Sequence, residues 1–360
     1  MSMFRKILIL IIIIIFSYIL YRLMETRRTL LSMTNDDIYK EGFSLFSTPA
    51  SELSNMKITD VGPGISSFNT ANSNLPLREY IIKSSYNTAF SGSFMNLDTI
   101  RYVLSRGCRF VDFEVYMIDG APCVGCTTDP TYTNVTSQNS ILLNDALKQV
   151  SFFGFASPTP NMNDPLFVQL RLHTKNNDNT DNTDIYKLVA MTIANTLQNK
   201  LYSGPVTGDT IIGDLMGKIV LIIDKVSAPD YKSYPICDNI AEPCYNLANY
   251  VNMESGGDVL RSYTYSNLLD QLTTPPYIHD DGKTSSVKMT RMSVPEQLIY
   301  SGNPAYSDFI SNYGVQFLAN RFYVKDTNLS LYEEFFSDNL SAIVPFNVAL
   351  PYISKNVINS

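Results

Sequence analysis

Two carboxylates on one face of an apolar strand constrain the fold of this chain more than any other feature. Within residues 109–116, Asp112 and Glu114 alternate with apolar side chains. Because successive side chains of a strand point to opposite faces, both acids leave the same face. Burying two acids together is costly unless a partner neutralises them. A fold that contains this strand must therefore supply that partner.

Strand and helix patterns alternate on both sides of these acids. Residues 80–88 are predicted to be a strand that runs into a polar tip, where chemistry would sit. Residues 98–107 are typical of a helix, with an acidic start, apolar residues at helical spacing and a glycine stop. Helices and buried strands then continue in turn, at 141–150, 164–173, 185–201 and 217–225. This alternation is the sequence signature of a βα barrel.

Composition excludes one class of partner. The 360 residues, of which 45% are hydrophobic, can form one large domain or two small ones. The net charge of −7 argues against nonspecific nucleic-acid binding, which needs clustered cations to displace counterions. We therefore expect no nucleic-acid partner.

The first 28 residues differ from the rest of the chain. Residues 7–21 form an apolar run, preceded by Arg5 and Lys6 and followed by three arginines. A spanning helix needs about 20 apolar residues, a length reached here if flanking apolar residues contribute and the arginines snorkel. No Ala-x-Ala-like cleavage site follows the run. The sequence therefore predicts an uncleaved, single-pass N-terminal signal-anchor in a membrane, with its orientation left open because cations lie on both flanks.

Ordered motifs surround the acidic strand. They are Ser84-Ser85-Tyr86-Asn87-Thr88, Arg106-Gly107-Cys108-Arg109, Asp112-x-Glu114, Asp119-Gly120 and Val124-Gly125-Cys126-Thr127. This series resembles the X half of the phosphoinositide-specific phospholipase C (PI-PLC) barrel, and weaker motifs from Leu247 onward are similar to its Y half. The resemblance implies an α/β fold, a PI-PLC-like TIM (βα) barrel, which the predicted transmembrane helix would precede.

The same patterns divide the chain into segments. We expect, in order, a membrane anchor at 1–28, a stalk or wrap rich in Ser, Asn, Thr and Gly at 29–76, the barrel at 77–352 and a tail at 353–360. Within the barrel we expect an X-like half at 77–225, a proline-rich linker with a loop-like insertion at 226–288, the start of the Y-like half near 247 and its end at 352.

The resemblance also implies a chemistry, phosphodiester cleavage by attack of an inositol hydroxyl with two histidines as acid and base. The histidine positions of the family fall on Tyr86 and Cys126. Acid-base catalysis at neutral pH needs a group that titrates near pH 7, whereas a phenol has an ordinary pKa of about 10. Cys126 is expected to be an apolar filler, or else a thiolate near a cation site. Of the two histidines, we expect a structural, hydrogen-bonded role for His173 and exposure for His279.

Three of the four calcium-ligand positions of the family carry residues that could bind the ion. Asn87, Asp112 and Glu114 match three of its ligand positions, and the fourth falls on Arg171. Calcium needs six or more oxygen ligands and several negative charges. We therefore predict that Arg171 occupies the place of the cation and forms a buried ion pair with both acids. No cofactor is expected, and Ca²⁺ would be required only if the protein is active.

The substrate side of the resemblance is sparse. The positions of the phosphate-reading lysines of the family fall on Ile222 and Asp224. Lys225 and Arg291 are the remaining candidates for substrate binding. Elsewhere, Cys237 and Cys244 flank a short loop and are expected to form a disulfide in an oxidising compartment or to stay reduced in a reducing one.

Three functions are compatible with these residues. The first is a membrane-anchored barrel without catalytic activity that serves as a binding or structural module, with a protein partner. The second is a divergent phosphodiesterase that uses Tyr86, Cys126 or His173 to cleave a lipid headgroup. The third is a barrel that holds a different ligand in the same mouth. Fold alone does not choose among them, because sites rather than scaffolds determine activity.

Overall fold

The computed structural model describes residues 17–18, 47–57, 63–68, 73–175, 183–234, 244–278, 290–294 and 302–357. The chain divides into two compact units, Met1–Phe46 and Ser47–Ser360, and the description below concerns the second. Apart from residues 17 and 18, the predicted anchor at residues 7–21 lies outside the described ranges. Within those ranges, no helix is both long and apolar enough to cross a membrane.

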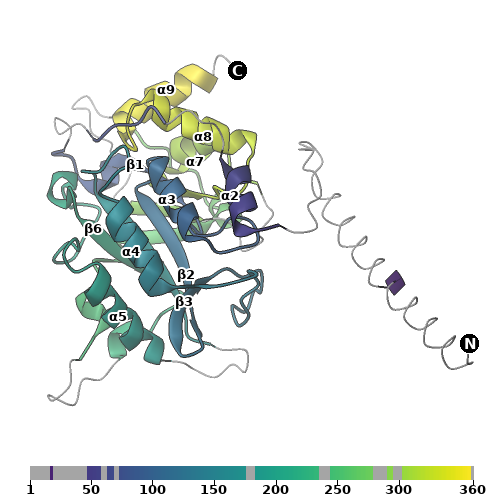
Figure 1. Ribbon diagram of the computed structural model, residues 1–360. Coiled ribbons are helices and arrows are strands. Elements are labelled where there is room, and N and C mark those ends of the chain that lie inside the picture. Colours follow the sequence, from purple (N-terminus) through teal and green to yellow (C-terminus); the bar gives the residue numbers. More distant parts are fainter. Residues whose placement is uncertain are drawn as a thin grey trace, which may run out of the picture. The chain divides into compact units, whose positions relative to one another are not determined.

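Eight parallel strands in the described part of the chain close into a barrel (Figure 1). In order around the ring they are β1 (Tyr80–Ser85), β2 (Phe110–Ile118), β5 (Leu166–His173), β6 (Ile219–Asp224), β7 (Met253–Ser255), β8 (Leu260–Thr264), β9 (Thr290–Val294) and β10 (Phe317–Asn320). The pairing of Ser84 with Phe110 closes the ring between β1 and β2. Three antiparallel strands extend it, β3 (Ala121–Gly125) and β4 (Ile141–Leu142) from β2, and β11 (Ile343–Pro345) from β1. The predicted α/β barrel is therefore confirmed.

Helices cover the outside of this ring (Figure 1). They are α3 (Leu97–Ser105), α4 (Leu143–Phe153), α5 (Asp184–Thr196), α6 (Tyr265–Leu269), α7 (Tyr306–Tyr313), α8 (Thr327–Asp338) and α9 (Phe346–Val357), with short 3-10 turns η2 (Leu77–Glu79), η3 (Ile212–Leu215), η4 (Tyr231–Ser233) and η5 (Leu247–Asn249). Helix α3 begins where the Asn96 side chain accepts the amide of Asp98 at 2.9 Å, and it stops before Gly107, whose φ of 83° suits glycine. Helix α9 continues into the predicted tail.

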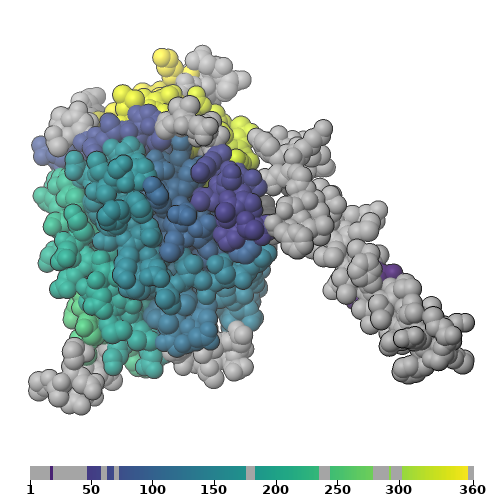
Figure 2. All heavy atoms as spheres, in the orientation of Figure 1, coloured from purple at the N-terminus to yellow at the C-terminus, as the bar shows by residue number. Residues whose placement is uncertain are grey.

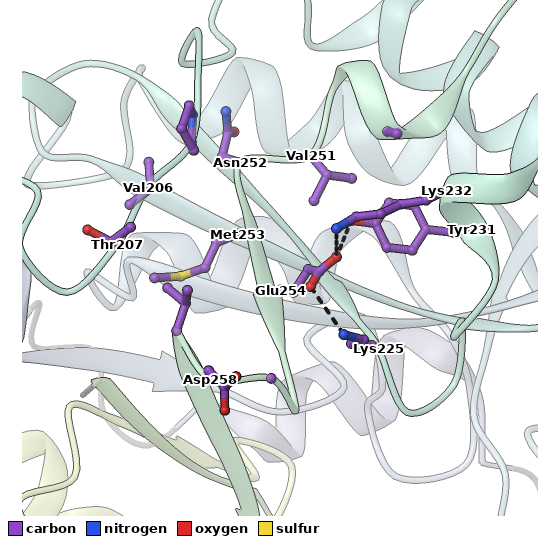
Figure 3. A pocket seen from close by; sticks show the side chains of 14 residues that line it. Val206, Thr207, Lys225, Tyr231, Lys232, Val251, Asn252, Met253, Glu254 and Asp258 are labelled. Atoms are coloured by element: carbon purple, nitrogen blue, oxygen red, sulfur yellow. Dashed lines mark hydrogen bonds and ion pairs between the residues drawn. The ribbon is translucent and has the colours of Figure 1, made fainter.

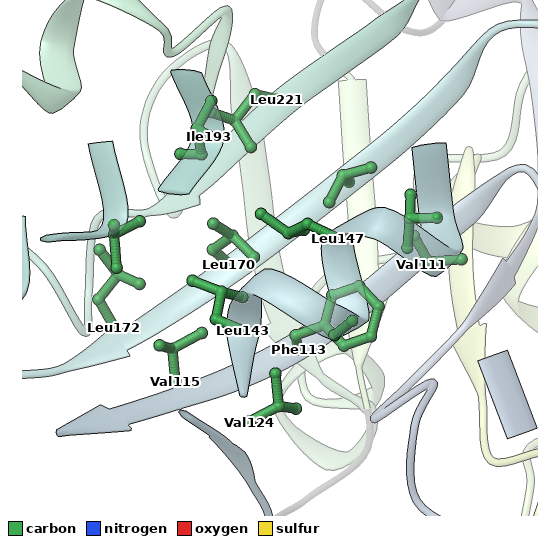
Figure 4. Close-up of a cluster of buried hydrophobic side chains, with 14 of the residues drawn as sticks. Val111, Phe113, Val115, Val124, Leu143, Leu147, Leu170, Leu172, Ile193 and Leu221 are labelled. Carbon is green, nitrogen blue, oxygen red and sulfur yellow. The ribbon is translucent and has the colours of Figure 1, made fainter. Parts of the chain in front are cut away.

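Side-chain alternation places the core on both sides of the barrel wall. Val111, Phe113 and Val115 of β2 pack outward with α4 and α5 (Figure 4). Inside the barrel, the Phe317 ring lies 5.3 Å from that of Phe110 and 5.2 Å from that of Phe167. Because the apolar residues of β2 face the helices, Asp112 and Glu114 must face the barrel interior above this aromatic floor.

The described part of the segment predicted as a stalk or wrap includes a helix that contacts the barrel unit. Helix α2 (Pro49–Met56) begins with a capping box at Thr48 and buries Met56. The Tyr102 hydroxyl of α3 donates to the Met56 carbonyl at 3.1 Å, and Glu52 accepts a hydrogen bond from Ser91 at 2.7 Å. Figure 2 shows α2, in purple, packed against the barrel unit.

The predicted linker at 226–288 contains β7, β8 and α6, and all three follow residue 247, near which the Y-like half is expected to begin. Strand β7 pairs Met253 with Ile222, and β8 pairs Leu260 with Thr290. These strands have only three and five residues and hold several polar ones, so they lack the apolar run on which strand prediction depends.

The Arg106-Gly107-Cys108-Arg109 motif stabilises the fold and lies away from the acids. Arg109 is fully buried and donates to the carbonyls of Gly154, Asp164 and Pro165 at 2.9, 2.7 and 3.0 Å. Arg106 donates through Nε to Glu333 of α8 at 2.8 Å. Because buried carbonyls need donors, Arg109 fixes the loop before β5 and thereby the strand that carries Arg171.

Candidate functional site at the barrel mouth

The carboxyl ends of β1, β2 and β5 bring the candidate residues together. Asn87 follows β1, the two acids lie on β2, and Arg171 lies near the end of β5. The register between the parallel strands pairs Glu114 with Arg171 and Asp112 with Gln169. Asn87 has a φ of 44°, which turns the chain so that its amide meets Asp112. In TIM barrels, active sites lie at this end.

Arg171 is the centre of the cluster. Its Nε donates to Asp112 Oδ1 at 3.0 Å, and Nη1 donates to Glu114 Oε1 at 2.7 Å. Its Nη2 donates to Asp112 Oδ2 at 2.8 Å and to Asn87 Oδ1 at 2.6 Å. The buried ion pair predicted from the sequence is therefore present. Although burial favours the neutral form, Asp112, Tyr86 and Glu114 raise the pKa of Arg171 well above its ordinary value, so it stays charged.

Every carboxylate oxygen of the two acids has a donor. Asp112 Oδ2 also accepts the Asn87 backbone N–H at 3.0 Å, and Glu114 Oε1 accepts Asn87 Nδ2 at 3.3 Å. Glu114 Oε2 accepts the Tyr116 hydroxyl at 2.9 Å and the Thr127 amide at 3.2 Å. Because a buried carboxylate is costly mainly while its lone pairs lack donors, this network offsets the desolvation of both acids.

This cluster does not fit a calcium ion. Calcium takes about six to eight oxygen ligands, whereas here a guanidinium lies among the oxygens of Asn87, Asp112 and Glu114. The Arg171 guanidinium already neutralises the acids and donates hydrogen bonds to their oxygens. Over the described ranges, no group of three or more His, Cys, Asp or Glu side chains is arranged to hold a metal ion.

Tyr86 and Cys126, the positions of the family histidines, lie within this cluster. The Arg171 guanidinium stacks on the Tyr86 ring at 4.5 Å, and Asn87 Nδ2 donates to the Cys126 sulfur at 3.2 Å. Burial raises the pKa of the Tyr86 phenol and of the Cys126 thiol well above their ordinary values, with Glu114 adding to both shifts. Neither group therefore titrates near neutral pH, which acid-base catalysis there requires.

His173, for which a structural, hydrogen-bonded role is expected, is held by ring stacking. Its ring lies between those of Tyr116 and Tyr132, at 4.8 and 4.5 Å. Among the described residues its buried Nε2 has no hydrogen-bond partner. Burial, together with the charge of Arg171, lowers the pKa of His173 to about 3. The imidazole is therefore neutral at physiological pH. The other histidine, His279, lies outside the described residues.

The lowered pKa of His173 predicts a loss of stability in acid. The unfolded chain binds this proton near the ordinary pKa of 6.5, whereas the folded chain binds it only near 3. Acidification through this window therefore favours unfolding. At about pH 4, His173 lowers the free energy of unfolding by about 3 kcal/mol. We expect His173→Phe, which keeps the stacking, to flatten the acid limb of the unfolding free energy measured by urea denaturation. His279→Phe is the matched control, and equal slopes in the two variants would contradict the prediction.

The candidate substrate residues are dispersed. Ile222 and Asp224 are buried in β6, and burial raises the pKa of Asp224. Lys225, which directly follows β6, lines a cavity of about 430 Å³ and lies 3.7 Å from Glu254 (Figure 3). Glu254 also pairs with Lys232 at 2.6 Å, so Lys225 belongs to an ion cluster with a second exposed lysine. Arg291 lies in β9, and its side chain is outside what the structure describes.

Residues that the sequence did not indicate complete the mouth. Tyr132 lies in the loop after β3 and stacks on His173. Arg321 follows β10, is 1% exposed and interacts with Tyr323. Asp129-Pro130 marks a turn near Tyr132, but no local pattern indicates a partner on another strand.

The cysteines fall into two groups. Cys108, Cys123 and Cys126 carry free, buried thiols. Cys244 is disulfide-bonded, whereas Cys237, its expected partner, lies outside the described residues.

The fold and the mouth define the class of this protein, an α/β barrel with a polar cluster at the carboxyl ends of its strands. Residues 73–225 match the family model of the phosphatidylinositol-specific phospholipase C, X domain. The resemblance to the PI-PLC family that the sequence suggested is therefore confirmed over this segment. No curated protein sequence matches the chain.

Two solved structures support the fold. PLC21 of L. pealei is 18% identical, with a TM-score of 0.56 over 76% of this chain and 37% of its own. PLC21 of S. officinalis is also 18% identical, with a TM-score of 0.53 and the same coverage. This chain thus spans just over a third of the length of those proteins. A calcium-dependent phosphoinositol-specific phospholipase C from Pseudomonas is 12% identical, with a TM-score of 0.44 over 79% of this chain and 100% of its own.

Proposed function

We propose that this protein is a membrane-anchored, catalytically inactive PI-PLC-like barrel that serves as a binding or structural module. One observation carries the proposal: Arg171 donates to Asn87, Asp112 and Glu114 together. Those residues stand at three calcium-ligand positions of the resemblance, and the guanidinium meets their demand for a cation. The acids are then retained because they and Arg171 stabilise one another.

The acid and base of the phosphodiester cleavage that the resemblance implies are missing as well. Tyr86 and Cys126 both have a pKa raised by burial, and both contact the same polar cluster. A phosphodiesterase needs one group to accept a proton and another to donate it near neutral pH. Neither residue supplies such a group. Asp224, at a phosphate-reading position, would repel a phosphorylated headgroup if ionised.

A hydrolysis assay tests this proposal. The full-length chain in mixed micelles is given phosphatidylinositol or its phosphorylated forms, with calcium or with a chelator, and the Pseudomonas enzyme serves as positive control. We expect no turnover above the blank in either condition. Turnover that is lost in chelator and in Asp112→Asn would overturn the proposal.

The alternative function is a divergent phosphodiesterase that cleaves a lipid headgroup, and one observation favours it. His173 places an imidazole at the carboxyl end of β5, where active sites of such barrels lie. Its pKa of about 3 makes it a weak base. Turnover that survives the chelator and disappears in His173→Phe would support this alternative. Both of its ring faces are covered by tyrosines, however, which limits the access of a substrate.

The membrane location rests on the apolar sequence of residues 7–21. We propose a protein partner because a barrel that catalyses no reaction would act by binding another molecule through its surface. Alkaline extraction of membranes that contain the full chain tests the anchor, with retention expected and release contradicting it.

A further inference from the structure

An aromatic pocket of about 480 Å³ lies at the barrel mouth, and its lining does not include Arg171, Asp112 or Glu114. His173 at the end of β5 forms one wall, and residues that follow β6 form another. Its rings come from Tyr132, His173, Tyr186 and Tyr234. The volume lies within the range of about 300–1,000 Å³ for small-ligand sites, which also combine aromatic walls with a few polar groups.

Tyr132 is held in this pocket against a conformational cost. Its φ of 57° lies in the left-handed region, which bulky residues rarely adopt. The carboxylate of Asp129 holds the loop, accepting hydrogen bonds from Thr131, Thr133 and Asn134 at 2.7–3.2 Å. The Tyr132 amide also donates to the Asp129 carbonyl at 3.0 Å. Backbone strain that the surroundings maintain is concentrated at functional sites, so the position of this ring calls for a function.

The rings leave flat faces for a ligand. One face of the Tyr132 ring stacks on His173. The Tyr234 ring stacks on Tyr186, with 6.3 Å between the ring centroids and 29° between the ring planes. Among the described residues, neither Tyr132 nor Tyr234 stacks on a second ring, and Tyr234 is 38% exposed. A flat ligand with C–H groups on its face can stack there, because the face of an aromatic ring carries partial negative charge.

The polar lining selects an uncharged, hydroxylated ligand. Lys175 and Asp230 contribute one charge of each sign, so the lining has no net charge for a polyanion. Hydroxyl groups at the rim come from Thr174, Thr183 and Ser227, and Thr183 precedes α5 without capping it. We propose that the aromatic pocket binds an uncharged sugar ring, with its C–H face on Tyr132 or Tyr234 and its hydroxyls at the rim.

This inference rests on the proposed function only in treating the barrel as a binding module. The pocket does not include Arg171 or the two acids. Hydrolysis of a phosphoinositide together with sugar binding would overturn the proposed function and leave the pocket intact. Absence of both hydrolysis and sugar binding would overturn the pocket alone.

The test uses the full-length chain in a detergent without a sugar headgroup. Glucose, galactose, mannose and N-acetylglucosamine are titrated at millimolar concentration, beside myo-inositol. Saturation-transfer NMR reports contact with the ring C–H protons of the sugar. The imidazole signals of His173, assigned with His173→Phe, report binding at this pocket, because the chain has only one other histidine.

We expect at least one sugar to receive saturation at its ring protons and to shift the His173 signals. Tyr132→Ala and Tyr234→Ala should each weaken its binding about three- to tenfold. Tyr277→Ala, which removes a 63% exposed tyrosine outside the pocket, is the matched control and should have no effect. Thermal unfolding of each variant shows whether weaker binding reflects a lost contact or a loss of folding. Because Tyr234 is partly exposed, we expect Tyr234→Ala to disturb the fold less than Tyr132→Ala.

Three results would overturn the proposal. The first is that none of the four sugars binds, and the second is that a sugar binds equally well in both folded tyrosine variants. The third is binding of myo-inositol without binding of any sugar, which would assign the pocket to a free cyclitol.

Discussion

Replacement of Arg171 by methionine is expected to lower the free energy of unfolding by about 3–5 kcal/mol, because it leaves two buried acids without their cation. Asp112 and Glu114 are both fully buried. Burial already raises the pKa of Asp112, and the Arg171 guanidinium is the largest influence that opposes the shift. Without it, the acids must take up protons or stay charged in a medium of low polarity. Urea denaturation at neutral pH measures the loss.

Two further variants show whether charge causes this loss. The triple variant Arg171→Met with Asp112→Asn and Glu114→Gln removes all three charges, and we expect it to recover part of the stability. Arg101→Met is the matched control, because Arg101 is exposed and its guanidinium lies 4.9 Å from the Phe153 ring. A surface change of this kind usually costs about 0.5 kcal/mol or less. A similar loss in Arg171→Met and Arg101→Met would contradict the central role of Arg171.

We expect Arg171→Glu to create a calcium response and the wild-type chain to show none. The substitution replaces the guanidinium by a third carboxylate, beside the Asn87 amide oxygen and the two acids. Without calcium, repulsion among three carboxylates makes this variant less stable than wild type. With calcium at about 100 times its dissociation constant, binding to the folded state returns about 2.7 kcal/mol. The melting temperature with and without calcium measures this effect.

Arg171→Gln is the control for the charge in this experiment. It matches glutamate in size but adds no carboxylate, so its melting temperature should respond less to calcium. The wild-type chain should not respond. If calcium raised the melting temperature of wild type as much as that of Arg171→Glu, Arg171 could not be occupying the place of the cation.

The local hydrophobic pattern of the sequence was sufficient to predict the strands in the first half of the barrel. Strands β5 and β6 are apolar runs between helical patterns, and their predicted ranges contain the observed Leu166–His173 and Ile219–Asp224. The same reasoning failed for β7 and β8, which are short and partly polar. Their existence depends on neighbours that pair with them in the ring, and such pairing leaves no periodic signal in the segment itself.

The sequence by itself determined the alternation that sends Asp112 and Glu114 to one face and their need for a cation, and the resemblance to the PI-PLC family pointed to Arg171 as the residue to supply it. The first two follow from strand periodicity and the cost of burying charge, which can be assessed locally. Only the tertiary structure decided that one guanidinium reaches both acids and Asn87, and that Tyr132 stacks on His173. Those contacts join residues brought together by strand register and by a loop after β3, and this geometry exists only once the barrel closes.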